Sequence, residues 1–390
     1  MSTLKVNTIR HIGASSDAVT LATDGTCTAK ITNNLSNRNL VVNGSCIVAQ
    51  RSTSPVTDDS YRTVDRFALD YSGTDNHPTQ AQHALTSSDT GPWEKGFRYS
   101  FHVTNGDQTS GAGTGDEMNI DYRFEAQDIA NSGWNYTSAS SYITLSFWVK
   151  ASVAQDYKFY LKTEDGTEKG YPMSTGSLSA NTWTKITKTI PGHADLQFDN
   201  NNAKGLAIEW FPFIGTDKTG SVTDNAWMNY SGSTRVNDMA STWWTTNDST
   251  FELTGLQLEV GDVATDFEHR SYRDELARCK RYYQQYPELA ADGYAPYPSG
   301  TVAIMDATTA AWPMTFDTMR AAPTVSWTGN HRIIEVNTVR NVSGFTAYHG
   351  SASTGWMVIT CSGGGMTAGH SGLVGRDNST TTYMKFSAEL

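Results

Sequence analysis

The segment from Phe251 to Tyr286 constrains the fold most, because a strand pattern there runs directly into a helix pattern. Apolar residues alternate with polar ones up to Leu253 and again from Leu256, on the opposite parity. Gly255 lies where the parity changes, as a β-bulge requires. The segment therefore predicts the last strand of one sheet-built domain, joined by a helix to a second domain.

The helix is predicted from its end signals. Ser271 is placed to cap the first turn, and Asp274 and Glu275 lie within that turn, where negative charge is favoured. The basic pair at 280–281 lies near the other end, and Pro287 is expected to stop the helix.

Five residues of this predicted helix follow a 4-3-4-3 spacing, which places them on one face. They are Tyr272, Leu276, Cys279, Tyr283 and Tyr286. Two interpretations stay open. Either the face packs on the neighbouring sandwich of its own chain, or it is a seam at which copies of the chain associate. Two heptads alone make a weak coiled coil.

The same region resembles a segment that recurs in structural proteins of tailed bacteriophages, particularly tail fibres of marine and cyanobacterial phages: LEVGDVATDFEHRSYRDELARCKRYY. Three other stretches of the sequence resemble other parts of such fibres. Their attachment end is similar to MSTLKVNTIRH with TDGTCTAKI, the start of their jelly roll to NLVVNGSCIVAQR with TVDRF, and their first distal strands to MTFDTMRAAPTVSW. The resemblance implies an elongated homotrimeric fibre that attaches to the virion at one end and meets the host surface at the other.

The periodic patterns divide the chain into four parts and predict an all-β fold. Residues 1–40 hold brief strand-like pieces that cannot form a core alone, so we expect an arm that orders against virion tail or adaptor proteins. Residues 41–270 predict an antiparallel jelly-roll β-sandwich, which resembles carbohydrate-binding modules in fold. Residues 271–299 form the helix and linker. Residues 300–390 predict a smaller, distal C-terminal β-sandwich whose last strand reaches the end of the sequence.

Charge and hydropathy argue against two classes of partner. The net charge of -11 is spread along 390 residues without a basic cluster, so neither nucleic acid nor an anionic membrane is an expected partner. No apolar run is long enough for membrane insertion. The first residues show no signal-peptide pattern, so we expect assembly in the cytoplasm of a bacterial host.

A search for catalytic chemistry finds no supporting motif. Asp116 with Glu117, and Glu164 with Asp165, are adjacent carboxylates in glycine-containing turns, where such groups are usually solvated. A glycosidase instead needs two carboxylates facing each other across a cleft. No nucleophile elbow, phosphate-binding loop or HExxH motif is present. We therefore expect no enzyme activity and no catalytic residues.

No metal or cofactor is expected either. The four cysteines follow no metal or redox spacing and are predicted to be small buried hydrophobes: Cys27, Cys46, Cys279 and Cys361. A structural Ca²⁺ held by loop oxygens at 115–121 or 195–202 is a lesser alternative to ordinary turns.

Aromatic residues are the positive chemical signal, because sugars bind with their C–H faces on aromatic rings. Two groups lie in polar loop contexts and are candidate carbohydrate-binding residues: Trp243 and Trp244, and then Tyr348, His349 and Trp356. The alternative for each group is a ring at the edge of a core or in a subunit interface. Trp148, Trp183 and Trp210 lie in strand patterns and are assigned to cores, although Trp148 falls opposite the main apolar stripe.

These inferences lead to one main hypothesis. The chain is expected to be a bacteriophage tail fibre, located on the virion, that recognises host cell-surface glycans. One alternative is a capsid-decorating or structural fibre protein without a ligand, and another is a polysaccharide depolymerase. Binding to host cells would separate the first alternative from the hypothesis, and release of reducing ends would identify the second.

Overall fold

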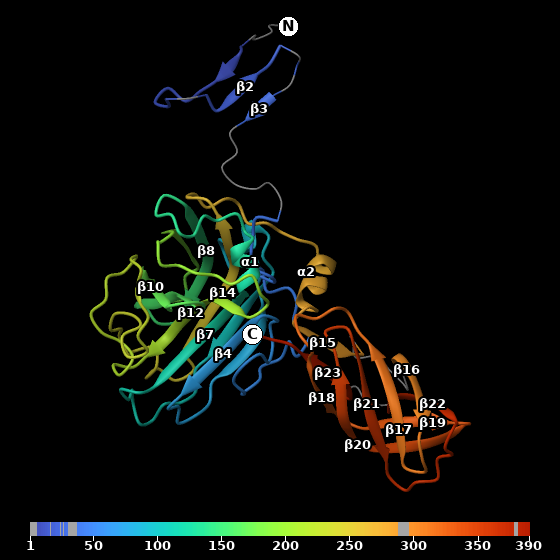
Figure 1. The fold of residues 1–390 in the computed structure, drawn as a ribbon. Coiled ribbons are helices and arrows are strands. Elements are labelled where there is room, and N and C mark those ends of the chain that lie inside the picture. The colour runs from blue at the N-terminus through green and yellow to red at the C-terminus, as the bar shows by residue number, and fades with distance from the viewer. Residues whose placement is uncertain are drawn as a thin grey trace.

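A computed structural model describes residues 6–15, 17–23, 25, 27–29, 37–287, 296–377 and 381–390. The described chain is almost entirely β-structure, as predicted. It forms a small three-stranded sheet, a two-sheet sandwich, and a closed barrel with a further three-stranded sheet beside it (Figure 1). No helix in this described part is long and apolar enough to cross a membrane.

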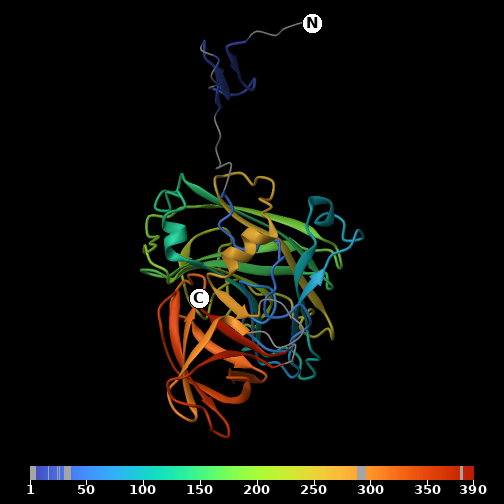
Figure 2. The same cartoon turned by 90° about the vertical axis from the view of Figure 1, so that its right-hand side faces the viewer.

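The N-terminal sheet contains β1 (Thr8–Ile9), β2 (Val19–Leu21) and β3 (Cys27–Ala29), paired antiparallel in that order. It stands apart from the sandwich in two views (Figures 1 and 2). Ile9 is 55% exposed and Leu21 39% exposed, so these strands bury little apolar surface of their own. Attachment to virion proteins through residues 1–40 stays a prediction, and residues 1–5 and 30–36 of that range lie outside the described residues.

The sandwich consists of two antiparallel sheets, as predicted. The six-stranded sheet has the order β13 (Met228–Asn229), β10 (Lys169–Ser177), β9 (Asp156–Thr163), β12 (Lys204–Ile214), β7 (Glu117–Glu125) and β4 (Phe67–Ser72). The five-stranded sheet has the order β11 (Thr184–Pro191), β8 (Tyr142–Ala151), β14 (Thr250–Val260), β6 (Tyr99–Thr104) and β5 (Thr79–Ala84). Two short helical segments lie between strands: η1 (Trp93–Lys95) and α1 (Ala126–Ala130).

One core fills the space between the two sheets. Alternate residues of most strands face inward, which is the pattern that the sequence predicted. Phe147 on β8 meets Phe159 on β9 edge to face at 5.3 Å, and also Trp210 on β12 at 5.5 Å. All three side chains are at most 1% exposed, so aromatic contacts join the two layers at the centre of the sandwich.

The predicted bulge in β14 is confirmed. The pairing of β14 with β8 shifts register between Thr254 and Gln257, and Gly255 has a φ of 63°. A Cβ atom at Gly255 would lie 2.7 Å from Phe97 Cζ, so only glycine fits beneath that ring. The bulge lets Leu253 and Leu256 both face the core, each 1% exposed.

The predicted helix forms but is shorter than expected. Helix α2 spans Tyr272–Cys279, and the Ser271 hydroxyl accepts from the Asp274 amide at 3.2 Å, which confirms the cap. The expected continuation to Pro287 is wrong. Residues Tyr283–Tyr286 form strand β15, whose backbone pairs with β23 (Tyr383–Ser387), and this distant pairing prevails over the local helix signal.

The single helical face predicted for Tyr272, Leu276, Cys279, Tyr283 and Tyr286 is therefore wrong as well. Tyr272 is 55% exposed on α2, whereas Cys279 and Tyr283 are at most 3% exposed inside the chain. Because the last two residues of the set lie on a strand, the five side chains form no continuous seam. Intrachain packing accounts for the buried members.

The C-terminal part forms a closed barrel rather than the expected second sandwich. The strands close in the order β16 (Pro296–Ile304), β17 (Thr309–Thr315), β21 (Thr354–Cys361), β20 (Thr338–Gly350), β19 (His331–Glu335) and β22 (Ser371–Arg376). Closure follows because β22 pairs with both β16 and β19. Beside the barrel, β23 lies between β15 and β18 (Thr324–Thr328), so the expected last strand forms, but it ends at Ser387 and does not reach the end of the sequence.

Three of the four cysteines are buried free thiols, as predicted: Cys46, Cys279 and Cys361. Burial raises the pKa of Cys46 to about 12, which makes its thiol unreactive at neutral pH. The side chain of Cys27 lies outside the described part of the chain.

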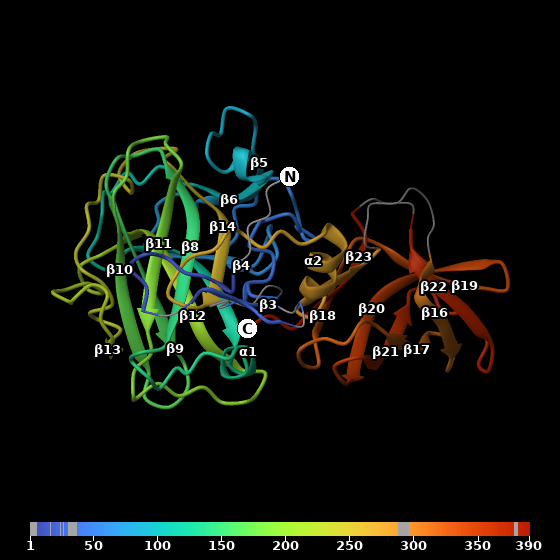
Figure 3. The same ribbon diagram turned by 90° about the horizontal axis from the view of Figure 1, so that it is seen from above.

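The sandwich and the C-terminal part meet at α2 (Figure 3) and at β15 (Figure 1). Arg66, 1% exposed, forms an ion pair with Glu389, and its guanidinium lies 3.5 Å from the centre of the Tyr282 ring. Arg51 contacts the same carboxylate at 3.1 Å and lies 3.6 Å from the centre of the Tyr283 ring. One carboxylate thus contacts two arginines of the sandwich, and Asp65 provides a second negative charge 3.6 Å from Arg51.

Glu389→Gln should lower the free energy of unfolding by about 3 kcal/mol, because it leaves Arg66 buried without its counter-ion. Urea denaturation followed by tryptophan fluorescence measures the loss. The exposed change Glu94→Gln is the control and should shift stability by less than about 0.5 kcal/mol. An equally small shift for both variants would show that the ion pair does not hold the joint.

Candidate functional site

The paired tryptophans of the predicted polar loop do not form a surface site. Trp243 and Trp244 are both 0% exposed and belong to the sandwich core, so their assignment as carbohydrate-binding residues is wrong. Trp243 Nε1 donates to the Thr250 carbonyl at 3.0 Å, and Trp244 Nε1 donates to the Gly111 carbonyl at 2.9 Å. These backbone acceptors satisfy the indoles inside the protein, and the polar neighbours of the pair in sequence gave no sign of them.

The second predicted group lies on the barrel. Trp356 is 41% exposed on β21, and its backbone pairs with that of His349 on β20. The side chains of Tyr348 and His349 lie outside the described part of the structure. Carbohydrate binding by these three residues stays a prediction.

A pocket of about 300 Å³ opens on the outer face of the five-stranded sheet, and we call it the Trp148 pocket. Its walls come from β8, β11 and β14 and from the segments 85–98 and 261–270. The lining residues are Glu94, Lys95, Phe97, Ser146, Trp148, Lys185, Gly255, Asp266, Phe267 and His269.

Strand parity places Trp148 in this pocket. Phe147 and Val149 face the core with 0% exposure, so Trp148 between them faces outward and is half-buried. A Cβ atom on Gly91, whose φ is 95°, would lie 2.7 Å from the indole, so the backbone there closes on the ring. The assignment of Trp148 to a core is therefore wrong, although its position opposite the apolar stripe was a sequence signal for this site.

A second aromatic wall stands over the β14 bulge. The rings of Phe97 and Phe267 meet edge to face at 4.8 Å, and the His269 ring packs on Phe267, also at 4.8 Å. His269 Nε2 lies 2.8 Å from the Lys95 carbonyl oxygen, which ties the segment 261–270 to the segment 85–98. Both phenylalanines lie in irregular segments, so no periodic pattern pointed to them.

The pocket carries balanced charge. Glu94 and Asp266 offer carboxylates, Lys95 and Lys185 offer ammonium groups, and all four residues are exposed. The arrangement presents aromatic faces beside both hydrogen-bond donors and acceptors. Such a surface can hold a small polar ligand that has apolar faces and several hydroxyl groups.

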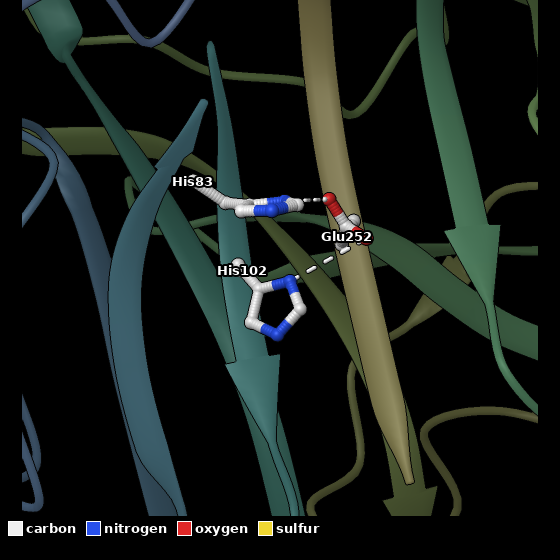
Figure 4. Close-up of side chains that lie close together, drawn as sticks. All are labelled: His83, His102 and Glu252. Atoms are coloured by element: carbon white, nitrogen blue, oxygen red, sulfur yellow. Dashed lines mark hydrogen bonds and ion pairs between the residues drawn. The ribbon is translucent and has the colours of Figure 1, made fainter. Parts of the chain in front are cut away.

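A cluster of ionisable residues lies on the same outer face. It adjoins the pocket through Lys150, which is two residues after Trp148 on β8. Glu252 Oε2 lies 3.1 Å from His83 Nδ1, and Glu252 Oε1 lies 3.4 Å from His102 Nδ1 (Figure 4). Lys150 Nζ approaches Glu252 Oε1 at 2.9 Å, and the Ser100 hydroxyl donates to Oε2 at 2.7 Å. In the described part of the chain, these two histidines and Glu252 are the group of three or more His, Cys, Asp or Glu residues placed closely enough for metal ligation.

The charged groups of this cluster shift the pKa values of Glu252 and His83. Burial opposes ionisation of Glu252, but the imidazoles of His102 and His83 and the Lys150 ammonium outweigh it and hold the pKa of Glu252 well below its usual range. The hydrogen bond to Glu252 raises the pKa of His83. Each of these residues lies on the outward parity of its strand, where a polar side chain is ordinary, so the sequence patterns did not single them out.

The adjacent carboxylates considered for catalysis lie apart from the Trp148 pocket lining and have protein partners. Lys218 Nζ and Arg235 Nη1 each contact Glu117 at 2.6 Å. Lys204 Nζ contacts Glu164 at 2.7 Å. Asp116 accepts from the Gly113 amide at 2.6 Å. Ion pairs and turn contacts, rather than the expected solvation, occupy these groups.

A different pair of acids faces each other within the six-stranded sheet. Asp121 on β7 and Glu209 on β12 are directly paired in register. Burial raises the pKa of Asp121, and burial together with the Asp121 carboxylate raises the pKa of Glu209. Burial and Asp121 also raise the pKa of Asp70 to about 6. The pairing depends on strand order, which periodicity alone did not give.

Comparisons with known proteins leave the chain without a family. No protein-family model matches it, and no curated protein matches it. Among solved structures, the enzymatically active domain of tailspike protein 4 from bacteriophage CBA120 aligns with 57% of this chain and 21% of its own, at 12% identity and a TM-score of 0.32.

Two further solved structures are carbohydrate-related by name. The N-terminal cellulose-binding domain of Cellulomonas fimi β-1,4-glucanase C aligns with 55% of this chain and 98% of its own, at 10% identity and a TM-score of 0.27. The CBM22-1–CBM22-2 tandem domain of Paenibacillus barcinonensis Xyn10C aligns with 88% and 100%, at 9% identity and a TM-score of 0.24. Likenesses this weak assign neither a family nor a ligand.

Glu209→Gln should make the protein less sensitive to alkaline pH. A carboxyl group whose pKa is raised by folding contributes stability at acidic pH, and that contribution is lost as the pH rises through the raised value. The variant should therefore gain stability over the wild type at about pH 8, and the gain should shrink towards pH 5. Urea unfolding at both pH values tests this, with the exposed change Asp107→Asn as the control. A gain that is equal at both pH values would contradict the assignment.

Proposed function

We propose that this chain is a non-enzymatic virion appendage, a bacteriophage tail fibre, that binds a neutral glycan of the host surface in the Trp148 pocket. The observation that carries the binding proposal is the outward-facing Trp148 indole, set in a pocket of about 300 Å³ with further aromatic and polar walls. That volume is at the lower end of the range for small-molecule sites, which suits one or two sugar units.

The chemistry of the lining supports a sugar. The ring of Trp148 offers an apolar face for the C–H groups of a pyranose, and Phe267 lines the same pocket. The exposed carboxylates of Glu94 and Asp266 accept hydrogen bonds from hydroxyl groups, while Lys95 and Lys185 donate to them. Two negative and two positive groups cancel, and this balance favours an uncharged glycan over a strongly acidic one.

The virion part of the proposal rests on the resemblance of four sequence stretches to phage tail fibres. Residues 1–40 would attach the chain to a tail or adaptor protein, and three copies would associate into the fibre. The site predicted for that association is not retained, because Tyr283 and Tyr286 lie on β15 rather than on α2. A trimer would therefore use other surfaces, and light scattering of the purified chain tests it. A monomer at micromolar concentration would contradict it.

Trp148→Ala should weaken glycan binding at least about tenfold, because it removes the face on which the sugar lies. A panel of bacterial surface polysaccharides, screened by glycan array and then by calorimetry, provides the ligand and the measurement. Trp356→Ala is the comparison variant, because it removes the exposed indole of the competing candidate site on the barrel instead.

The pair of variants separates the alternatives. Loss of binding in Trp356→Ala alone would move the site to the barrel. Normal binding in Trp148→Ala, with the fold intact by circular dichroism, would refute the Trp148 pocket. Release of reducing ends from the bound polysaccharide would show that the chain is a depolymerase. Absence of binding to the panel and to host cells would favour a structural or decorating protein.

A further inference from the structure

We propose that His83, His102 and Glu252 bind one divalent transition-metal ion of the zinc class. The three residues lie on β5, β6 and β14, three neighbouring strands of the five-stranded sheet, and their side chains point toward one another on its outer face (Figure 4). Two imidazoles and one carboxylate are a ligand set that zinc accepts, with a fourth position left for water.

The strand register builds this site. Glu252 is directly opposite His102. His83 on the edge strand is opposite Ser100, which is two residues from His102 on β6, so all three side chains lie on the same face of the sheet. The two imidazole rings lie 5.0 Å apart, and the ligand atoms of the three residues all lie within 4.8 Å of one another. Ligand atoms around a tetrahedral zinc ion with bonds of about 2.1 Å are about 3.4 Å apart. The carboxylate-to-imidazole distances of 3.1 and 3.4 Å, each to a different oxygen of Glu252, are close to that spacing.

The hydrogen bonding of His102 indicates an available ligand nitrogen. Its Nε2 lies 3.0 Å from the Thr104 hydroxyl, whereas its Nδ1 is buried and has no hydrogen-bond partner among the described residues. When Nε2–H donates to Thr104, the Nδ1 lone pair faces the Glu252 carboxylate. The Nδ1 lone pair and the carboxylate oxygen are then two hydrogen-bond acceptors that repel each other. A cation bound between them would replace this repulsion with attraction. A hydroxyl on the distal nitrogen is also the outer-shell support typical of metal-bound histidine.

Charge also favours a cation. Glu252 and Asp89 are negative and Lys150 is positive, so the group has a net charge of -1 when both imidazoles are neutral. Lys150 Nζ contacts Glu252 at 2.9 Å and Asp89 at 3.0 Å, and β8 carries it on the side of Glu252 away from the histidines. The ammonium approaches from the opposite strand, but it contacts Oε1, the oxygen of Glu252 that also faces His102. It also competes with the metal for Glu252, which lowers the affinity of the site.

A bound ion would join the edge of the sheet to its interior. Strand β5 is an edge strand that pairs only with β6 in its sheet, and the ion would connect it through His83 to β14 as well. The His83 side chain is 47% exposed, so solvent and metal reach the site from that side.

Calorimetric titration of the tag-free, full-length, chelator-treated chain with Zn²⁺ tests the proposal. The expected result is one ion per chain, with affinity at least about tenfold weaker in His83→Gln and in His102→Gln. Zinc should raise the melting temperature of the wild type but not of these variants. Lys150→Met should bind zinc more tightly than the wild type, because the competing ammonium is gone.

His370→Gln is the matched control, since His370 also pairs with a carboxylate, Glu335 at 3.0 Å, but without a second histidine. It should bind zinc as the wild type does. The proposal would be refuted if the wild type bound no stoichiometric zinc, or if both cluster variants bound zinc as tightly as the wild type. Circular dichroism without zinc checks folding. If His102→Gln does not fold, His83→Gln decides, because its position is half exposed and tolerates the change.

Discussion

The ion pair between Arg66 and Glu389 is the contact on which the arrangement of the protein depends. Arg66 is buried among tyrosines of both parts, with its guanidinium 5.5 Å from the centre of the Tyr122 ring and 3.5 Å from that of Tyr282. A guanidinium in such surroundings is tolerated only with a counter-ion, and residues near the end of the chain supply it. The sandwich therefore completes its own charge balance only when the C-terminal part is docked.

The outer face of the five-stranded sheet carries both candidate sites, the Trp148 pocket and the Glu252 cluster. Trp148 and Lys150 project from the same side of β8, so the aromatic pocket and the Glu252 cluster are neighbours on one face. Segments 85–98 and 261–270 cover part of that face, and the polar residues beneath them are almost fully buried: Ser146, Thr254, Gln257 and Glu259. A covered polar layer fixes the positions of the exposed groups above it, because each buried group must keep its hydrogen bonds.

The sequence predicted what depends on local pattern and missed what depends on distant partners. Strand alternation, the bulge at Gly255 and the cap at Ser271 are written in adjacent residues, and all three are confirmed. The indole partner of Trp244, the early end of α2 and the closure of the barrel each depend on residues far away in the chain. The candidate site was missed for the same reason, since its walls come from three strands and two irregular segments. The parity of Trp148 was the one part of it visible in the sequence.

The chain leaves the sandwich through β14 and α2 and returns to it with residues 388–390, where Arg123 Nη1 on β7 donates to the Leu390 carbonyl. The barrel is thus tethered at two points of the sequence instead of one. Force applied to the barrel would be divided between the covalent link at α2 and the contacts that residues 389 and 390 make with the sandwich. Bending at the joint would require the contacts of the last residues to break as well as the link at α2 to deform. The joint is therefore expected to be stiffer than a single covalent linker.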